Sequence, residues 1–207
     1  MSLTLAIIIL TVAASYYAWK NTHIQYRWMM TPYEIQRDKS YYRFITSGFI
    51  HADGMHLFFN MFTLFFFGDV VEQSFRAIYG GLVGSVLYIA FYLLGIIISD
   101  IPTYFKKRHT PNYSALGASG GVSAVVFSSI LFYPMADLCL YAILCLPGFI
   151  WGAIYLIYSH YSGKKAGDHI NHDAHLYGAL FGIIFTILIY PRVIPLFFEQ
   201  LKHFQLF

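Results

Sequence analysis

The stretch "PNYSALGASGGVSAVVFSSILFYP", residues 111–134, is an apolar run interrupted by small and hydroxylated residues. Its centre, "LGASGGVSA" (residues 116–124), holds three glycines and two serines. Glycine and serine form helices poorly and offer little apolar surface to lipid. We therefore expect this segment to face protein or a water-filled space rather than lipid.

The composition of the whole chain places this segment in a membrane. Of 207 residues, 58% are hydrophobic and 11% are charged, against about 25% charged in an average soluble domain. The formal net charge of +3 is too small and too scattered to indicate nucleic-acid binding. We expect one polytopic domain, residues 1–207, with the lipid bilayer as its surroundings and no nucleic-acid partner.

Six apolar runs predict an all-α fold with six transmembrane helices, since a span takes about 20 helical residues. They cover residues 3–19, 55–71, 78–99, 113–133, 136–158 and 174–190. The first run has no basic segment before it and no convincing cleavage site, so we expect it to be retained. The first connection, residues 20–54, is rich in aromatic and basic residues, which indicates a long interfacial loop.

Polar side chains gather where three of the predicted helices begin. His51, His56 and Asn60 surround the start of the second helix, Ser119 lies early in the fourth, and His175 lies in the first turn of the sixth. Alternating topology starts these three helices from the same side, so their polar residues converge at a similar depth. Ionisable residues within spans are rare and usually functional.

These residue types match the parts of a serine hydrolase. His175 is placed to accept the proton of Ser119 as general base. His56 and Asn60 share one helix face and are placed to donate hydrogen bonds to an oxyanion, together with the backbone N–H of Ser119. Each residue alone also has a structural interpretation, as a packing serine, an interfacial histidine or an interhelical donor.

Small residues predict how these helices come together. Gly117, Gly120 and Gly121 surround Ser119, and Gly178 and Gly182 are four apart in the sixth helix. This small-xxx-small pattern allows helices to approach closely.

No carboxylate is placed to complete a triad. Asp173 points about 200° around the helix from His175 and is expected to cap the helix, which predicts a Ser–His dyad. Cys139 and Cys145 fall on different faces of the fifth predicted helix, which predicts buried, unbridged thiols.

Taken together, the motifs resemble the rhomboid family of intramembrane serine proteases. The resemblance runs from about residue 42 to 182 and rests on "YRFITSGFIHADGMHLFFN", "GASG" and "AHLYGALFG". It implies a six-helix fold with a water-filled cavity and cleavage of transmembrane protein substrates without metal or another cofactor. It implies Ser119 as nucleophile, His175 as general base, and His56, Asn60 and the Ser119 N–H as oxyanion hole, with these supporting residues: Gly117, Gly120, His51 and Arg43.

Further positions follow from the same resemblance. Glu72 matches a structural glutamate at the inner end of the second helix. Pro147 and Gly148 correspond to the family's proposed lateral gate, and the alternative is a plain proline kink.

One position departs from the family pattern. Many members carry an aromatic residue four positions after the nucleophile, packed against the base. This chain has Ser123 there, which either packs or orients His175 by a hydrogen bond. Phe127, one turn further, is the alternative ring.

The orientation of the chain in the membrane is the second point at which the sequence conflicts with the family pattern. The first, third and fifth connections hold ten Lys and Arg, and the opposite side holds three. By the positive-inside rule, this places the first connection in the cytoplasm. The resemblance implies the reverse, with the N-terminus cytoplasmic, and we adopt it. The lack of a transit peptide and of extramembrane domains favours a bacterial inner membrane.

Two other functions stay open. A catalytically inactive rhomboid-like protein would keep the fold and bind membrane segments, although intact Ser119 and His175 argue against it. His169, His172 and His175 recur every three residues, and neutral imidazoles suit Zn²⁺. A polar helix start explains this pattern without a metal.

Overall fold

The computed structural model describes residues 2–140, 144–163, 171–202 and 204. Helices dominate it. In chain order they are α1 (Leu3–Lys20), α2 (Thr22–Trp28), α3 (Pro32–Asp38), α4 (Arg43–Thr46), the 3-10 turn η1 (Ser47–Phe49), α5 (Gly54–Tyr79), α6 (Gly81–Lys107), α7 (Ser119–Phe132), α8 (Gly148–Ser162), α9 (His172–Ile189) and α10 (Val193–Lys202). An antiparallel hairpin, β1 (Asp137–Leu140) and β2 (Leu144–Pro147), lies between α7 and α8.

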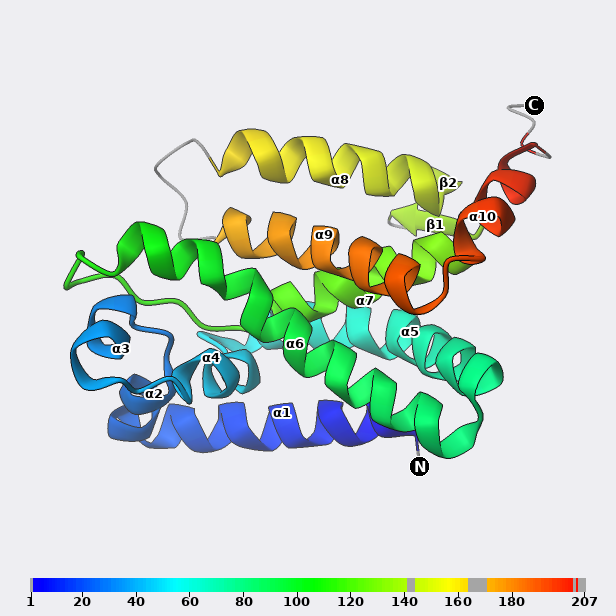
Figure 1. Cartoon of the computed structure of the whole chain (residues 1–207). Helices are drawn as coiled ribbons and strands as arrows, with labels where there is room; N and C mark the ends of the chain where they lie inside the picture. Colours follow the sequence, from blue (N-terminus) through cyan, green and yellow to red (C-terminus); the bar gives the residue numbers. More distant parts are fainter. Residues whose placement is uncertain (1, 141–143, 164–170, 203, 205–207) are drawn as a thin grey trace.

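The predicted all-α membrane fold is confirmed. Among the described residues, four helices are long and apolar enough to cross a membrane: α1, α5, α6 and α9. Figure 1 shows α1 along one side and α8 along the other, with these helices between them: α5, α6, α7 and α9. The core lies where α5, α6 and α7 meet, around fully buried aromatic side chains such as Phe75, Phe91 and Tyr92.

The fourth predicted helix begins later than expected. The run 113–133 is helical only from Ser119. Before it, Ala115 pairs with Met30 as an isolated β-bridge, and Gly117 has a φ of +125°. This extended approach and positive φ end at Ala118, so the helix starts at Ser119.

The fifth predicted helix, residues 136–158, was wrong over about its first half. Residues 137–140 and 144–147 form the paired strands β1 and β2, and α8 starts only at Gly148. Proline lacks an N–H and its ring clashes with the carbonyl four residues earlier, so it kinks or breaks a helix, and here the helix begins only after Pro147. Pro147 instead ends β2 and stands as the N-cap of α8.

The cysteine prediction was wrong for the same reason. Cys139 and Cys145 are directly opposed in the hairpin register and form a disulfide. Both residues are exposed. Opposed residues of an antiparallel pair project to the same face, whereas a helix would have separated them.

The first connection is folded rather than loose. It holds α2, α3, α4 and η1, which Figure 1 places beside one end of α1. Arg43 is buried in it and donates to the carbonyl oxygens of Tyr26 (2.7 Å) and Met29 (3.0 Å) and to the hydroxyl of Thr31 (3.0 Å). One guanidinium thereby ties α2, α3 and α4 together.

At the other end of the bundle, Glu72 has the structural role expected for it. This buried carboxylate accepts hydrogen bonds from the backbone N–H groups of Leu3 (3.1 Å) and Thr4 (2.9 Å). It thus satisfies the free N–H groups that begin α1 and attaches α1 to α5.

Candidate active site

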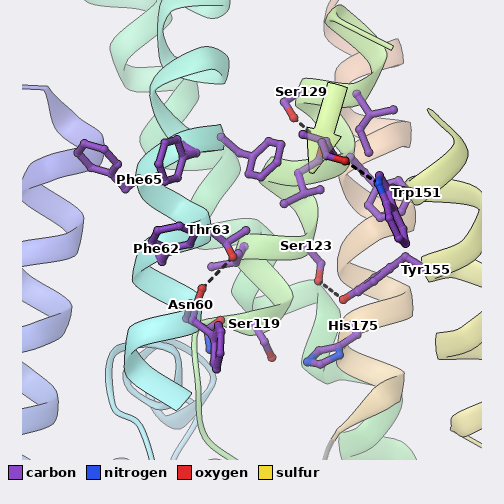
Figure 2. A pocket seen from close by; sticks show the side chains of 18 of the residues that line it. Asn60, Phe62, Thr63, Phe65, Ser119, Ser123, Ser129, Trp151, Tyr155 and His175 are labelled. Carbon is purple, nitrogen blue, oxygen red and sulfur yellow. Dashed lines mark hydrogen bonds between the residues drawn. The ribbon is translucent and has the colours of Figure 1, made fainter. Parts of the chain in front are cut away.

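A large cavity opens between α5, α7, α8 and α9. Its volume is about 2260 Å³, and His56, Asn60, Ser119 and His175 all line it. Figure 2 shows Ser119 between Asn60 of α5 and His175 of α9. The structure therefore brings together, in one cavity, four of the five polar residues that were predicted to converge, and His51 does not line it.

Ser119 occupies the first turn of α7. The first backbone hydrogen bond of this turn runs from Val122 N to Ala118 O (2.9 Å). The N–H groups of a first helical turn have no partner within the helix, and they lie at the positive end of the helix dipole. The hydroxyl of Ser119 therefore sits beside backbone donors suited to an oxyanion.

Glycines hold α7 and α9 together at backbone distance. A Cβ on Gly178 of α9 would overlap the carbonyl oxygen of Gly120, and a Cβ on Gly182 would overlap that of Ala124. A Cβ on Gly120 would in turn lie 3.5 Å from the carbonyl oxygen of Ala174. Since Gly120 follows Ser119 and Ala174 precedes His175, this contact sets Ser119 and His175 on facing turns.

Not every glycine near Ser119 serves the helices expected. Gly121 lies against Tyr92 and Ile96, and Gly120 lies against Ser99, so both also face α6. Gly117 is the one of the three that approaches α5. These three glycines were predicted to let the second and sixth predicted helices approach closely. That prediction is corrected, because they also let the third predicted helix, α6, approach.

Gly117 fits its position for two reasons. Its φ of +125° strains any residue with a side chain. A Cβ there would also lie 2.6 Å from Cε1 and 2.8 Å from Nε2 of His56. The imidazole of His56 therefore rests on the backbone that leads into Ser119.

α5 presents His56 and Asn60 on one face. Asp53 caps the helix by accepting a hydrogen bond from His56 N (2.8 Å). One N–H of the Asn60 amide donates to the His56 carbonyl oxygen (2.9 Å). A carboxamide has two N–H donors, so the bond to the backbone fixes Asn60 and leaves a second N–H.

His51 stands behind the site in a buried hydrogen-bond chain. Its Nε2 accepts from Ala118 N (3.3 Å), and its Nδ1 lies 3.0 Å from the hydroxyl of Ser15, which donates to Phe49 O (3.3 Å). This arrangement requires a neutral ring with its proton on Nδ1. Burial, and secondly the nearby His56 ring, lower the pKa of His51 to about 3.

Asp173 does not cap α9. The cap is Asn171, whose side-chain oxygen accepts from Ala174 N (3.2 Å). Asp173 pairs instead with Lys106 of α6 (2.7 Å). The expectation of a capping aspartate was wrong because Asn171 already occupies the N-cap position, directly before the helix.

The residue that sequence reasoning missed is Tyr155 of α8. Its hydroxyl lies 2.8 Å from the hydroxyl of Ser123, and its ring stacks on that of His175 with centroids 6.2 Å apart. Phe127 packs against Tyr155 at 5.7 Å. Ser123 therefore bonds to Tyr155, and the spacing of Tyr155 from the motifs gave no sign of this contact.

The remaining sequence-predicted positions lie elsewhere. Arg43 organises the first connection and does not line the cavity. Of the three histidines considered as metal ligands, His169 lies outside the described residues. His172 sets its ring edge against His175, with centroids 6.0 Å apart. In the described part of the chain, no three His, Cys, Asp or Glu side chains gather as metal ligands.

Comparisons with known proteins identify a family whose model covers most of the chain. The family model for the rhomboid domain matches residues 38–192. The chain is 30% identical over 142 residues to RHOMBOID-like protein 12, mitochondrial, of Arabidopsis thaliana, covering 65% of this chain and 42% of that protein. It is 31% identical over 145 residues to the human presenilin-associated rhomboid-like protein, mitochondrial, covering 67% of this chain and 35% of that protein.

A bacterial protein matches over a larger share of its own length. The chain is 25% identical over 154 residues to rhomboid protease GlpG of Haemophilus influenzae, covering 74% of this chain and 72% of that protein. The mitochondrial relatives are thus matched over less than half of their length, and GlpG over most of it. The matched segment 38–192 contains all four cavity residues named above, and on these grounds the chain belongs to the rhomboid family.

Proposed function

We propose that this protein is an intramembrane serine endopeptidase that uses Ser119 and His175 as a catalytic dyad. The observation that carries the proposal is the placement of Ser119 on the first turn of α7, in one cavity with His175, His56 and Asn60. Membership of a family that includes a rhomboid protease supports it.

The chemistry follows from the roles of these groups. The Ser119 oxygen attacks the scissile carbonyl carbon while its proton passes to the His175 imidazole. The carbonyl oxygen becomes an oxyanion that accepts hydrogen bonds from His56, Asn60 and the Ser119 N–H. The imidazolium then gives its proton to the leaving amine, and the peptide bond breaks. Water, deprotonated by His175, releases the acyl group and restores Ser119.

The cavity fits a peptide segment as substrate. Its volume exceeds the roughly 300–1,000 Å³ of small-molecule pockets, and it continues along α5 past Phe59, Phe62 and Phe66. These rings are more than half exposed, so an apolar chain has an apolar face to follow. We propose transmembrane protein segments as the substrates.

A serine-directed fluorophosphonate tests the proposal. We expect it to label the purified protein, and we expect labelling to vanish in Ser119→Ala and His175→Asn and to persist in EDTA. Circular dichroism confirms that both variants remain helical. Absence of labelling in the folded wild type would contradict the proposal and favour a membrane-segment-binding protein. Labelling lost to EDTA would favour metal chemistry.

We further propose a bacterial inner membrane location. For the orientation we propose a cytoplasmic N-terminus, which the family resemblance implies. The Lys and Arg count opposes this orientation, and so does the disulfide of the hairpin after α7, because disulfides persist in oxidising compartments. In a Cys139→Ser/Cys145→Ser background, Lys39→Cys should react with an impermeant maleimide in intact cells and Glu199→Cys only after permeabilisation. The reverse pattern would overturn the proposed orientation.

A further inference from the structure

The geometry points to Tyr155 as a positioning residue for His175, in which α8 supplies the ring that orients the base and Ser123 anchors that ring. The inference rests on the proposed role of His175 as general base. It assigns a function to an α8 residue outside the motifs and explains why position 123 is a serine.

The contact with His175 is a ring-on-ring stack. The two centroids are 6.2 Å apart and the planes are inclined by 24°, which lies within the offset-stacked geometry of aromatic pairs. Figure 2 shows Tyr155 reaching from α8 toward Ser123, with His175 beneath it. The second dihedral of a histidine side chain is broad and roughly two-fold, so a flat surface against the imidazole restricts it to a narrower range.

The stack also suits the charge that His175 acquires. When the imidazole accepts the proton of Ser119, it becomes a cation. The face of an aromatic ring carries negative electrostatic potential and attracts a cation placed over it. Tyr155 therefore favours the protonated base as well as its orientation, without taking part in proton transfer.

Ser123 fixes the tyrosine ring from the helix of the nucleophile. Its hydroxyl is 2.8 Å from that of Tyr155, and it lies one turn after Ser119 on the same face of α7. Phe127, one turn further, packs against the same ring at 5.7 Å. The helix that carries the nucleophile thus holds the ring that orients the base.

A neighbouring pair on the same two helices supplies a control. Tyr158, three residues after Tyr155, sets its ring against His172 with centroids 5.6 Å apart and planes inclined by 80°. His172 lies three residues before His175. Truncating Tyr158 therefore loosens the α8–α9 contact without removing the stack on His175.

Labelling kinetics with a fluorophosphonate test the inference. We expect Tyr155→Leu to lower the maximal inactivation rate by about 10- to 100-fold, because loss of orientation costs rate, while the probe concentration at half-maximal rate stays within about twofold. Tyr155→Phe keeps the ring and should lose only about two- to fivefold. Ser123→Ala should lower the inactivation rate by the same factor as Tyr155→Phe, because both variants remove the same hydrogen bond. The double variant should therefore lose no more than either single variant.

Tyr158→Leu is the control for general loosening and should stay within about threefold of wild type. An unchanged inactivation rate in Tyr155→Leu would overturn the inference. So would an equal loss in Tyr158→Leu, because the effect would then not be specific to the stack.

A second readout is independent of reactivity. In the Ser119→Ala background with ¹³C-labelled histidine, the Cε1–H signal of His175, assigned by its absence in His175→Gln, should show an aromatic ring-current shift. Tyr155→Phe should retain the shift and Tyr155→Leu should lose it. A His175 signal unaffected by Tyr155→Leu would contradict the inference.

The two proposals fail in different ways. A folded wild type that does not react with the probe contradicts the serine protease proposal, whatever the spectrum shows. A wild type that reacts normally, together with a Tyr155→Leu variant of equal rate, contradicts only the role of Tyr155.

Discussion

The α7–α9 and α8–α9 contacts act on the same residue, His175, by different means. Between α7 and α9 the backbones touch, because Gly178 and Gly182 leave no room for a side chain against Gly120 and Ala124. Between α8 and α9 the contact is made by aromatic rings. In the mechanism we propose, the first contact fixes the position of the base, His175, and the second fixes the orientation of its ring. We therefore expect changes to the first to be far more damaging.

The largest effect is expected at the backbone contact. Gly178→Val places branched carbons where the Gly120 carbonyl lies, and overpacking of this kind costs about 1–3 kcal/mol or more. We expect labelling of Ser119 to fall by at least about 100-fold, because a displacement near 1 Å costs that much. Gly148→Ala is the matched control, since its Cβ meets only ordinary contacts from 3.4 Å. A reactive Gly178→Val would show that α7 and α9 need not touch.

A smaller loss is expected where α7 approaches α5. Gly117→Ala imposes both a positive φ and a contact with His56, so we expect about 1–3 kcal/mol of destabilisation from the strain and about a tenfold loss of labelling as His56 is displaced. Gly80→Ala separates the two causes, because Gly80 also has a positive φ (82°) but nothing within 4 Å. If both variants lose the same reactivity, contact with His56 is irrelevant.

Acid should destabilise the protein at His51, whose neutral ring accepts a hydrogen bond from Ala118 N just before α7. The folded-state pKa of His51 is about 3, below the unfolded value of about 6.5, so its contribution to stability is full above pH 6.5 and is lost as the pH falls toward 3. Between pH 7.5 and 4.5 this loss amounts to about 2–3 kcal/mol. Chemical denaturation in detergent measures it.

His51→Asn is the control for this titration, because it removes the group while other acid-sensitive residues stay. The variant should be less stable at pH 7.5 and should lose less on acidification than the wild type. An equal loss in both proteins would show that His51 is not held neutral.

The smallest effect is expected outside both contacts. Asp173 pairs with the exposed Lys106, and exposed ion pairs contribute about 0–1 kcal/mol. Asp173→Asn should therefore leave labelling within about twofold of wild type, as should Lys106→Ala. Abolished labelling in a folded Asp173→Asn protein would mean that a third group assists His175 and that the dyad is incomplete.

Apolar periodicity and the spacing of small residues predicted the helices whose backbones lie in direct contact. The runs around α5, α6 and α9 are long and apolar, and Gly178 and Gly182 mark the face that meets α7. The hairpin was not predicted because the sequence of residues 138–146 is as apolar as that of a membrane helix. Only Pro147 indicates that the helix does not extend over this segment. α10 was also missed, since it is a short amphipathic helix after Pro191.

The candidate site likewise has a part that the sequence predicted and a part that it did not. Ser119, His175, His56 and Asn60 lie near the starts of helices, so helix order alone predicts that they meet. Tyr155 lies in the middle of α8, and its partner depends on the rotation of α8 about its own axis. The hairpin that precedes α8 contacts it, because Trp151 Nε1 donates to the carbonyl oxygen of Leu138 (2.8 Å), and the sequence pattern did not predict the hairpin.

Peptide cleavage tests the central claim most directly. The protein would be reconstituted in liposomes with a set of synthetic single-span peptides that carry glycine or proline at different depths, and the products would be weighed by mass spectrometry. We predict paired fragments cut within or beside the apolar segment by the wild type, and none with Ser119→Ala or His175→Asn. Equal fragments from wild type and Ser119→Ala, or no cleavage of any peptide by a wild type that reacts with the fluorophosphonate, would contradict it.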